Sequence, residues 1–277
     1  MSLTTPTGGR RVSEKLLGQL LFAGSAVVLV VIWHLWASSN SPLISPTPGA
    51  VLQRLIEYVG AGKANQHVLI TLQEIALGFL AGGILGVGLG IVAAEFNIAR
   101  RVIMPYVIIT QALPKFALAP ILVIWFGFGQ TPKVIIAALI AFFPLLENTF
   151  LGLTSVPSEM LELFRALRAS RWTTLIKARV PHAIPTIFSG FRVALMLALV
   201  GAVVAEYVGA NKGLGAQIIV AQGTLDTELM YVAFVLLTIL GLALDKLHGL
   251  IYRLVMRRLY GRTAGDDVTG RQSRVSV

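Results

Sequence analysis

Charged side chains inside otherwise apolar stretches are the residues of this sequence whose placement could do chemistry. Lys115 follows Pro114 in the apolar stretch 102–126, thirteen residues from its start, which is about 20 Å deep in a continuous helix. A lysine at that depth costs about 2.5–3.5 kcal/mol in a membrane, so another group must offset its charge. Glu147 of the apolar stretch 133–155 lies within about two helical turns of the same depth and is one candidate.

Three interpretations of Lys115 remain open. In the first, the lysine pairs with Glu147; in the second, it is buried in its neutral form or reaches water along a purely structural route. In the third, it faces a polar path through the membrane and meets an anionic solute, with Gln111 one helical turn below it on the same face. Glu147, next to Asn148, is then either structural or part of the lining of that path.

Arg192 and Asp245 form a second set of embedded charges. Arg192 lies seven residues into the apolar stretch 185–209, and Asp245 lies seven residues before the end of the stretch 229–252. Both residues are therefore about 10 Å from the same membrane face, which predicts a structural ion pair. The alternative is that the long arginine side chain extends to the interface by itself.

Two glutamates, Glu74 and Glu206, lie near the opposite ends of their apolar stretches. We expect both carboxylates to be solvated there, because a polar group at the edge of a span reaches water readily. Glu206 has the alternative of lying at the outer mouth of a path or on a face where a partner docks.

The remaining residue types exclude several kinds of catalytic site. The sequence has no Cys and four scattered His, so we expect no disulfide, no thiol catalysis and no metal site. No Gly-x-x-x-x-Gly-Lys-Ser/Thr motif occurs, so we expect no ATP site in this chain. An intramembrane enzyme would need paired polar residues at matching depth, and His34 stands alone near the end of its apolar stretch.

The elements that must position these side chains are membrane-spanning helices. Of the 277 residues, 56% are apolar or aromatic and 13% are charged, with a mean hydropathy of +0.79. This composition excludes a disordered chain, a nucleic-acid-binding domain and an ordinary soluble enzyme. We therefore predict an all-α integral membrane protein with six transmembrane helices. They span residues 18–37, 68–94, 102–126, 133–155, 185–209 and 229–252.

The distribution of basic residues predicts the orientation. With six spans both termini lie on one side, and that side collects sixteen Lys and Arg residues against four in the opposite loops. We therefore expect both termini in the cytoplasm, and we assign the net charge of +10 to cytoplasmic loops and not to nucleic-acid binding. A cytoplasmic segment, 1–17, precedes a single transmembrane domain, 18–258, and a disordered tail, 259–277, follows it. The stretch 18–37 is too long for the core of a cleaved signal peptide.

Two local patterns add detail to this plan. Thr47 and Pro48 precede an amphipathic stretch, 50–59, that ends at Gly60, which predicts a short helix at the interface with threonine as its N-cap. In the second span, glycines recur every four residues and so share one face, where another helix can approach closely. That face packs either within the chain or at a dimer seam. The glycines are Gly78, Gly82, Gly86 and Gly90.

The segment 156–184 is the longest cytoplasmic loop of this plan, and it has helical periodicity. Apolar residues alternate with basic ones from Leu161 to Leu175, which indicates a helix–turn–helix parallel to the membrane. We expect it to end before Pro181 and Pro185, because proline breaks a helix and redirects the chain into the fifth span. Composition alone equally favours an amphipathic helix on a surface of anionic lipid.

This loop resembles the coupling loop of the permease subunits of ABC importers. The family pattern is Glu-Ala-Ala, three residues, Gly, nine residues, Ile, one residue, Leu-Pro, and Glu162 and Pro181 stand in register with it. The departures are Leu163 and Phe164 for Ala-Ala, Arg168 for Gly, Ala178 for Ile and Val180 for Leu. Because the family glycine makes the bend between two short helices, we expect Ala169 or Ser170 to make it here.

Other motifs are similar to those of the permeases for nitrate, sulfonates and taurine. The longest lies within 112–129, where Ala-Leu-Pro is followed by Leu-Ala-Pro-Ile-Leu-Val-Ile-Trp-Phe-Gly-Phe-Gly. The resemblance covers residues 15–258. The other similar motifs are Thr71-Leu72, Leu77-Gly78-Phe79, Gly190-Phe191-Arg192, Glu206 and Gly213-Leu214-Gly215.

The resemblance implies a type I ABC importer permease fold, MetI-like, with a coupling helix between helices 4 and 5. It implies a homodimer around a central path, two copies of an ABC ATPase subunit that bind ATP and Mg, and an extracytoplasmic solute-binding protein. The chain itself would be neither an enzyme nor a cofactor-binding protein, and it would lie in the bacterial cytoplasmic (inner) membrane. The residues implied for ATPase coupling are Glu162, Phe164, Arg165, Ala166, Leu167, Arg168, Ala169 and Pro181.

For the solute, the resemblance implies a small polar and often anionic molecule, such as nitrate, a sulfonate or taurine, or a vitamin or pyrimidine precursor. In a dimer, two copies of Lys115 would form a cationic constriction that favours anions. The alternative function is a secondary transporter driven by an ion gradient, which would favour an internal repeat with broken helices. No convincing repeat is visible, and the basic loop would have no role in such a transporter.

Overall fold

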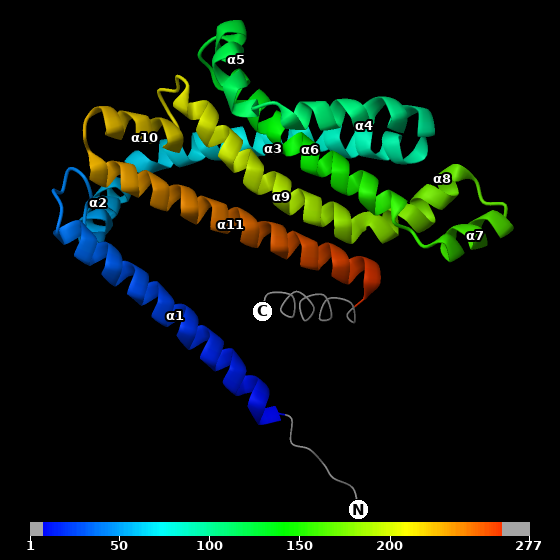
Figure 1. The fold of residues 1–277 in the computed structure, drawn as a ribbon, viewed down its shortest axis with the longest axis horizontal. Helices are drawn as coiled ribbons and strands as arrows, with labels where there is room; N and C mark the ends of the chain where they lie inside the picture. The colour runs from blue at the N-terminus through cyan, green and yellow to red at the C-terminus, as the bar shows by residue number, and fades with distance from the viewer. Residues whose placement is uncertain (1–7, 262–277) are drawn as a thin grey trace, which may run out of the picture.

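A computed structural model describes residues 8–261, and every regular element in that range is helical (Figure 1). Five helices are long and apolar enough to cross a membrane, and α4 with η1 and α5 makes a sixth span when this bent pair is counted as one. The predicted all-α membrane fold is therefore confirmed. The elements are α1 (Gly8–Ser38), α2 (Pro48–Gly60), α3 (Lys63–Glu95), α4 (Asn97–Ala112), η1 (Lys115–Leu118), α5 (Ala119–Phe126), α6 (Gln130–Thr154), α7 (Ser158–Ala166), α8 (Arg171–Thr174), η2 (Leu175–Arg179), α9 (Val180–Tyr207), α10 (Leu214–Gly223) and α11 (Thr227–Tyr260).

The first and last helices are longer than the apolar stretches that predicted them. α1 begins at Gly8, before the predicted span, and α11 continues to Tyr260. Helical hydrogen bonding continues beyond the apolar residues because the basic residues that flank them are also good helix formers. The predicted tail, 259–277, lies outside the described residues from 262 onward, and so do residues 1–7.

The centre of the fold is formed by α3, α6 and α9, which pack against one another. The glycine face of α3 makes this packing possible. A Cβ atom on Gly82 would lie 2.4 Å from the carbonyl oxygen of Ala138 in α6, and one on Gly86 would lie 2.6 Å from that of Phe142. This face is therefore used for packing within the chain and not for a dimer seam.

Helices α1 and α2 attach to one end of this bundle. The predicted cap of α2 forms, since Thr47 Oγ1 accepts a hydrogen bond from Ala50 N at 3.3 Å and Pro48 occupies the first position. α1 diverges from the other helices in Figure 1, and it is held near its carboxyl end, where Trp33 stacks on Tyr231 of α11 at 5.6 Å between ring centroids. Most of α1 is thus left to face lipid.

The predicted third span, 102–126, is not one straight helix. α4 ends at Ala112, and Leu113 is extended, with φ −72° and ψ 134°, because the ring of Pro114 disfavours a helical conformation in the residue before it. η1 and α5 then continue at 85° to α4. Lys115 lies at this bend, so the span is broken at the lysine and not continuous through it.

Pro181 and Pro185 do not end a helix, contrary to the sequence prediction. Leu175–Arg179 forms a π turn directly before α9, and Pro181 occupies the first turn of α9, where a missing N–H is tolerated. The carbonyl oxygen of Pro181, which Pro185 leaves without its helical partner, accepts the hydroxyl of Tyr260 instead. The chain therefore passes from the loop into the span without a break.

Candidate functional site

Lys115, Gln111 and Glu147, which the sequence singled out as lining a possible path, border one cavity of about 470 Å³. Lys115 belongs to η1, Gln111 to the last turn of α4 and Glu147 to α6. We call the contact between these elements, which extends along α4 to Arg100 opposite Phe150 of α6, the α4–α6 seam. The bend after α4 is what brings the lysine to the mouth of this cavity.

Lys115 contacts an aromatic ring in this cavity and not a carboxylate. Its Nζ lies 4.6 Å from the ring centroid of Phe143. Glu147 accepts a hydrogen bond from the side-chain amide of Gln111 instead. Within the part of the chain that the structure describes, no carboxylate oxygen lies within 4.0 Å of the lysine. The ammonium group therefore borders a ring and an open cavity, where an anion could reach it.

The loop 156–184 contains two short helices, α7 and α8, as its periodicity predicted. Arg168, between them, has a φ of +51°, and Ala169 N donates to Phe164 O at 2.9 Å to close the end of α7. The bend therefore lies at Arg168, the position of the family glycine, and the expectation that Ala169 or Ser170 makes it is wrong. Backbone hydrogen bonds at the helix end impose the left-handed conformation there, whatever the side chain.

The two helices present a surface that is both apolar and basic. Leu163, Leu167 and Trp172 are exposed over 57, 69 and 67% of their surface. Leu163 and Trp172 were not among the residues implied for coupling, although Leu163 lies one helical turn before Leu167, the residue that follows α7. Of the residues implied for coupling, α7 carries Glu162, Phe164, Arg165 and Ala166, the turn carries Leu167, Arg168 and Ala169, and α9 carries Pro181.

Two ion pairs join segments on this side of the bundle. Arg179, at the base of the loop, donates to Glu95 of α3 at 2.7 Å. Arg192 Nε lies 2.7 Å from Asp245 Oδ1, and a second bond of 3.3 Å joins the same groups. The two residues that we expected to pair are thus in contact, and the contact joins α9 to α11.

Glu74 and Glu206 are not solvated, contrary to expectation, but buried together at most 1% exposed. Lys133 Nζ donates to Glu74 Oε1 at 2.7 Å. Glu206 accepts Thr71 Oγ1 at 2.7 Å and the backbone N–H of Gly215 at 2.5 Å. We call these five residues the glutamate cluster. It joins α3, α6, α9 and α10, and sequence reasoning missed it because it treated each glutamate separately.

Arg54 and Asp226 hold α2 against the start of α11. Their side chains are 2.7 Å apart, and Asp226 also accepts Leu229 N at 3.0 Å as the N-cap of α11. Burial alone would raise the pKa of Asp226, but the Leu229 N–H and the Arg54 guanidinium outweigh it and lower that pKa. This contact therefore favours the ionised carboxylate.

Over residues 8–261, no three His, Asp or Glu side chains are placed to hold a metal ion together. What the arrangement offers is a cation beside a cavity and an exposed apolar and basic loop. Chemically, the first can bind an anion, and the second can bind a protein surface.

Comparison with known proteins relates these features to one family. Residues 86–260 match the family described as binding-protein-dependent transport system inner membrane component. The chain is 38% identical to the riboflavin transport system permease protein RibX of Chloroflexus aurantiacus, over 83% of this chain and 87% of that protein. It is 30% identical to the putative aliphatic sulfonates transport permease protein SsuC of Bacillus subtilis, over 83% of this chain and 84% of that protein.

The fold also matches a solved structure of the MetNI methionine ABC transporter in an inward-facing conformation. The TM-score is 0.60 at 21% identity, over 68% of this chain and 94% of the other. These matches favour an ATP-driven importer over a gradient-driven secondary transporter. The chain belongs to the family of binding-protein-dependent transport system inner membrane components, and it is a permease subunit of an ABC importer for a small solute.

Proposed function

We propose that this permease, with a second copy of itself, forms the path by which a small anionic solute crosses the bacterial cytoplasmic membrane. An extracytoplasmic binding protein delivers the solute, and two copies of a separate ABC ATPase subunit bind and hydrolyse ATP on the cytoplasmic side. The excess of Lys and Arg at the termini and in the loop 156–184 supports a topology with both termini in the cytoplasm.

Lys115 is the observation that carries the choice of an anion. Its ammonium group lies over Phe143 and borders a cavity of about 470 Å³, a volume within the usual range for small-molecule sites. An ammonium group without a carboxylate partner attracts an anion strongly in such a site. The sulfonate relative supports this solute class, and the riboflavin relative supports a vitamin as the second candidate.

The loop 156–184 is the element that we propose to contact the ATPase subunit. Its exposed Leu167 and Trp172 supply apolar contact area, and the Arg168 turn fixes the angle between α7 and α8. Arg179 joins the base of the loop to Glu95 of α3, so a displacement of the loop reaches the bundle. One element with two positions can then couple ATP binding to access to the path.

Substitution of Lys115 by methionine tests the path. In vesicles that contain the permease with its ATPase and binding protein, we expect Lys115→Met to lower solute uptake at least tenfold, or about 1.4 kcal/mol, while assembly and basal ATP hydrolysis persist. Lys246→Met, which removes an exposed lysine of α11, is the matched control. Unchanged uptake would contradict a role of Lys115 in the solute path. If assembly is lost and Glu147→Gln restores it, Lys115 and Glu147 form a structural pair instead.

Substitution of Leu167 by aspartate tests the coupling loop. We expect Leu167→Asp or Phe164→Asp to abolish solute-stimulated ATP hydrolysis, because central apolar contacts of an interface are worth about 2 kcal/mol or more. Leu259→Asp changes an equally apolar, exposed residue at the end of α11 and should have no such effect. Retention of normal stimulation by both loop variants would exclude this loop as the coupling element.

A further inference from the structure

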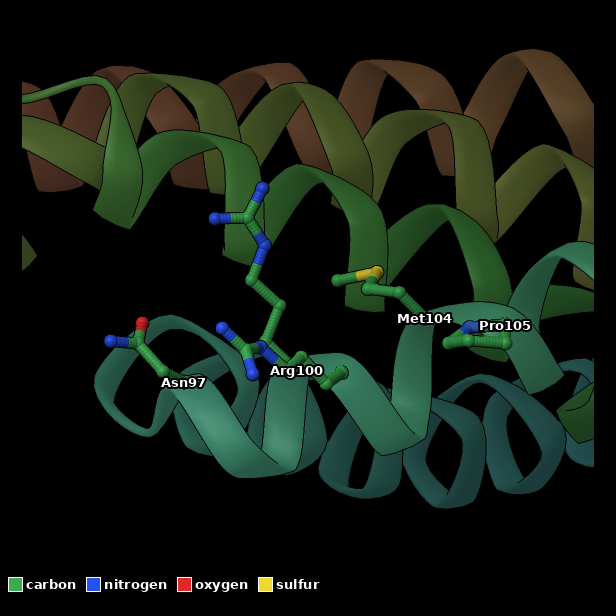
Figure 2. Close-up of a pocket in the computed structure, with 5 residues that line it drawn as sticks. Asn97, Arg100, Met104 and Pro105 are labelled. Carbon is green, nitrogen blue, oxygen red and sulfur yellow. The ribbon is translucent and has the colours of Figure 1, made fainter.

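A second cationic position lies at the other end of the α4–α6 seam. Asn97, Arg100 and Met104 lie on successive turns of α4 (Figure 2). Together with Arg101 and Pro105 they line a cavity of about 500 Å³. The same helix therefore borders two cavities, and each has at least one basic side chain in its lining.

Both ends of the seam hold a cation in the same way. The Arg100 guanidinium carbon lies 5.0 Å from the ring centroid of Phe150, and Lys115 Nζ lies 4.6 Å from that of Phe143. The two phenylalanines are seven residues apart, which is about two turns of α6, so they share the face that looks toward α4. Along the seam, ring faces of α6 thus contact a cation of α4 and a cation of η1.

Four basic side chains that join two helical elements are each paired with a carboxylate. Within residues 8–261, by contrast, no carboxylate oxygen lies within 4.0 Å of Arg100, Arg101 or Lys115. A ring face attracts a cation by about 0.5–2 kcal/mol but leaves its net charge in place. The charges of the seam therefore remain available to an anion. The neutralised pairs, each at 2.7 Å, are Arg54 with Asp226, Lys133 with Glu74, Arg179 with Glu95 and Arg192 with Asp245.

We infer that Arg100 and Arg101 form a second anion station, which holds the solute after it leaves Lys115. This inference rests on the proposed function, an anionic solute that moves along α4 toward the cytoplasm. Arg100 and Gln111 are about 16 Å apart along the helix, so one small anion cannot contact both stations at once and must occupy them one after the other. Two sites of moderate strength let an ion enter and still leave.

A single introduced thiol measures the electrostatic field of this cavity directly. Because the sequence has no cysteine, Met104→Cys is unique in the chain. We compare how fast an anionic and a cationic methanethiosulfonate reagent modify it, in the intact importer held in phosphatidylcholine nanodiscs. The double variant Arg100→Gln/Arg101→Gln should lower the anionic-to-cationic rate ratio at least tenfold. The matched control, Arg257→Gln, removes one exposed charge at the end of α11 and should leave the ratio unchanged.

Two further measurements with the same thiol identify the anion that the cavity binds. Ethanesulfonate, used as the probe solute, should slow the anionic reagent at the Met104→Cys thiol, and this protection should vanish in the double variant. If phosphatidylglycerol nanodiscs protect the thiol and ethanesulfonate does not, the cavity holds a lipid headgroup and the solute station is overturned. An unchanged rate ratio in the double variant overturns it as well.

Uptake measurements separate this inference from the proposed path. The double variant should lower uptake severalfold, whereas normal uptake would overturn the station even if the electrostatic field is present. If Lys115→Met leaves uptake unchanged while the double variant lowers it, the role of Lys115 fails and the arginine station stands.

Discussion

Two polar clusters lie between the helices of this permease, and they treat charge in opposite ways. In the glutamate cluster, Glu74 and Glu206 are almost wholly buried, and Lys133, Thr71 and the N–H of Gly215 supply their donors. In the α4–α6 seam, the cations instead face aromatic rings and two cavities. One cluster is closed around its charges, and the other leaves them accessible.

We expect this difference to separate charges that stabilise the fold from charges that can bind a ligand. A buried carboxylate is tolerated only where protein donors replace its water, so removal of a donor exposes the full desolvation cost. A cation that lies over an aromatic ring beside a cavity has no buried carboxylate partner, so its removal leaves no buried charge unpaired. Substitutions in the two clusters should therefore fail in different assays, one in stability and the other in transport.

The matched substitutions Lys133→Met and Lys115→Met give the largest expected effect. Lys133→Met leaves Glu74 buried without its donor and should lower the free energy of unfolding by about 3–5 kcal/mol. Lys115→Met removes a cation that has no carboxylate partner, and the free energy of unfolding should stay within about 1 kcal/mol of its original value. Denaturant titration in mild detergent, followed by circular dichroism, measures both.

A double variant sharpens this test. Glu74→Gln in the Lys133→Met background removes the buried charge together with its partner and should recover at least half of the lost stability. Equal losses in the two lysine variants would contradict the division into a closed and an open cluster.

A glycine beside the glutamate cluster gives the next largest effect. Gly213 has a φ of +118°, and a Cβ atom there would lie 2.0 Å from Glu206 Oε1. Gly213→Ala should cost about 3 kcal/mol, because backbone strain and displacement of the carboxylate add. Gly127→Ala, at a φ of +76° with no atom within 4 Å of the added Cβ, should cost about 1–2 kcal/mol for the backbone strain alone. Similar thermal midpoints would mean that the carboxylate moves aside freely.

The membrane-spanning helices and the start of α2 could be predicted because the signals for them are local. Hydrophobic runs marked the membrane-spanning segments, and the Thr47-Pro48 pair marked the start of α2 within a residue. The periodicity of the loop 156–184 likewise predicted its two short helices. Lys115 could be singled out for the same reason, since the cost of a charge in an apolar stretch is visible from the sequence alone.

The partners of the charged residues could not be predicted, because they depend on how distant segments meet. Thr71 and Glu206 are 135 residues apart in the sequence, and only the packing of α3 on α9 brings them together. Nor does the sequence show that Phe143 lies under Lys115. The bend at Pro114 has a local cause, but its 85° angle is a property of the packed helices.

The Arg54–Asp226 pair, which is partly exposed, is an intermediate case between the two clusters. Burial opposes ionisation of Asp226, but the Leu229 N–H and Arg54 bring its pKa below the usual value of 3.8. The folded pKa is the lower one, so the pair stabilises the fold above about pH 4, and this contribution is lost as the pH falls through the folded pKa.

Asp226→Asn keeps the helix cap and removes the charge. It should lower the free energy of unfolding by about 0.5–1 kcal/mol at neutral pH and flatten its decline between about pH 5 and pH 3. Parallel melting curves of the two proteins over that range measure the difference. The same slope in both would show that the pair contributes nothing to the acid sensitivity.

The effect expected at Arg168 is confined to one turn, where conformation and charge can be separated at a single residue. Its φ of +51° costs about 1 kcal/mol in a residue other than glycine. Arg168→Gly should therefore stabilise the turn by about that amount and slow hydrogen exchange at Ala169 N, which is bonded to Phe164 O at 2.9 Å, about fivefold. Arg168→Lys keeps the charge and the conformational cost, so its exchange should match the original protein. Asparagine tolerates the left-handed region, so the exchange rate of Arg168→Asn should lie between those of the glycine and lysine variants. Identical exchange in the glycine and lysine variants would mean that the backbone bonds of the turn alone set its stability, and that any effect of Arg168→Gly on ATPase coupling comes from the lost charge.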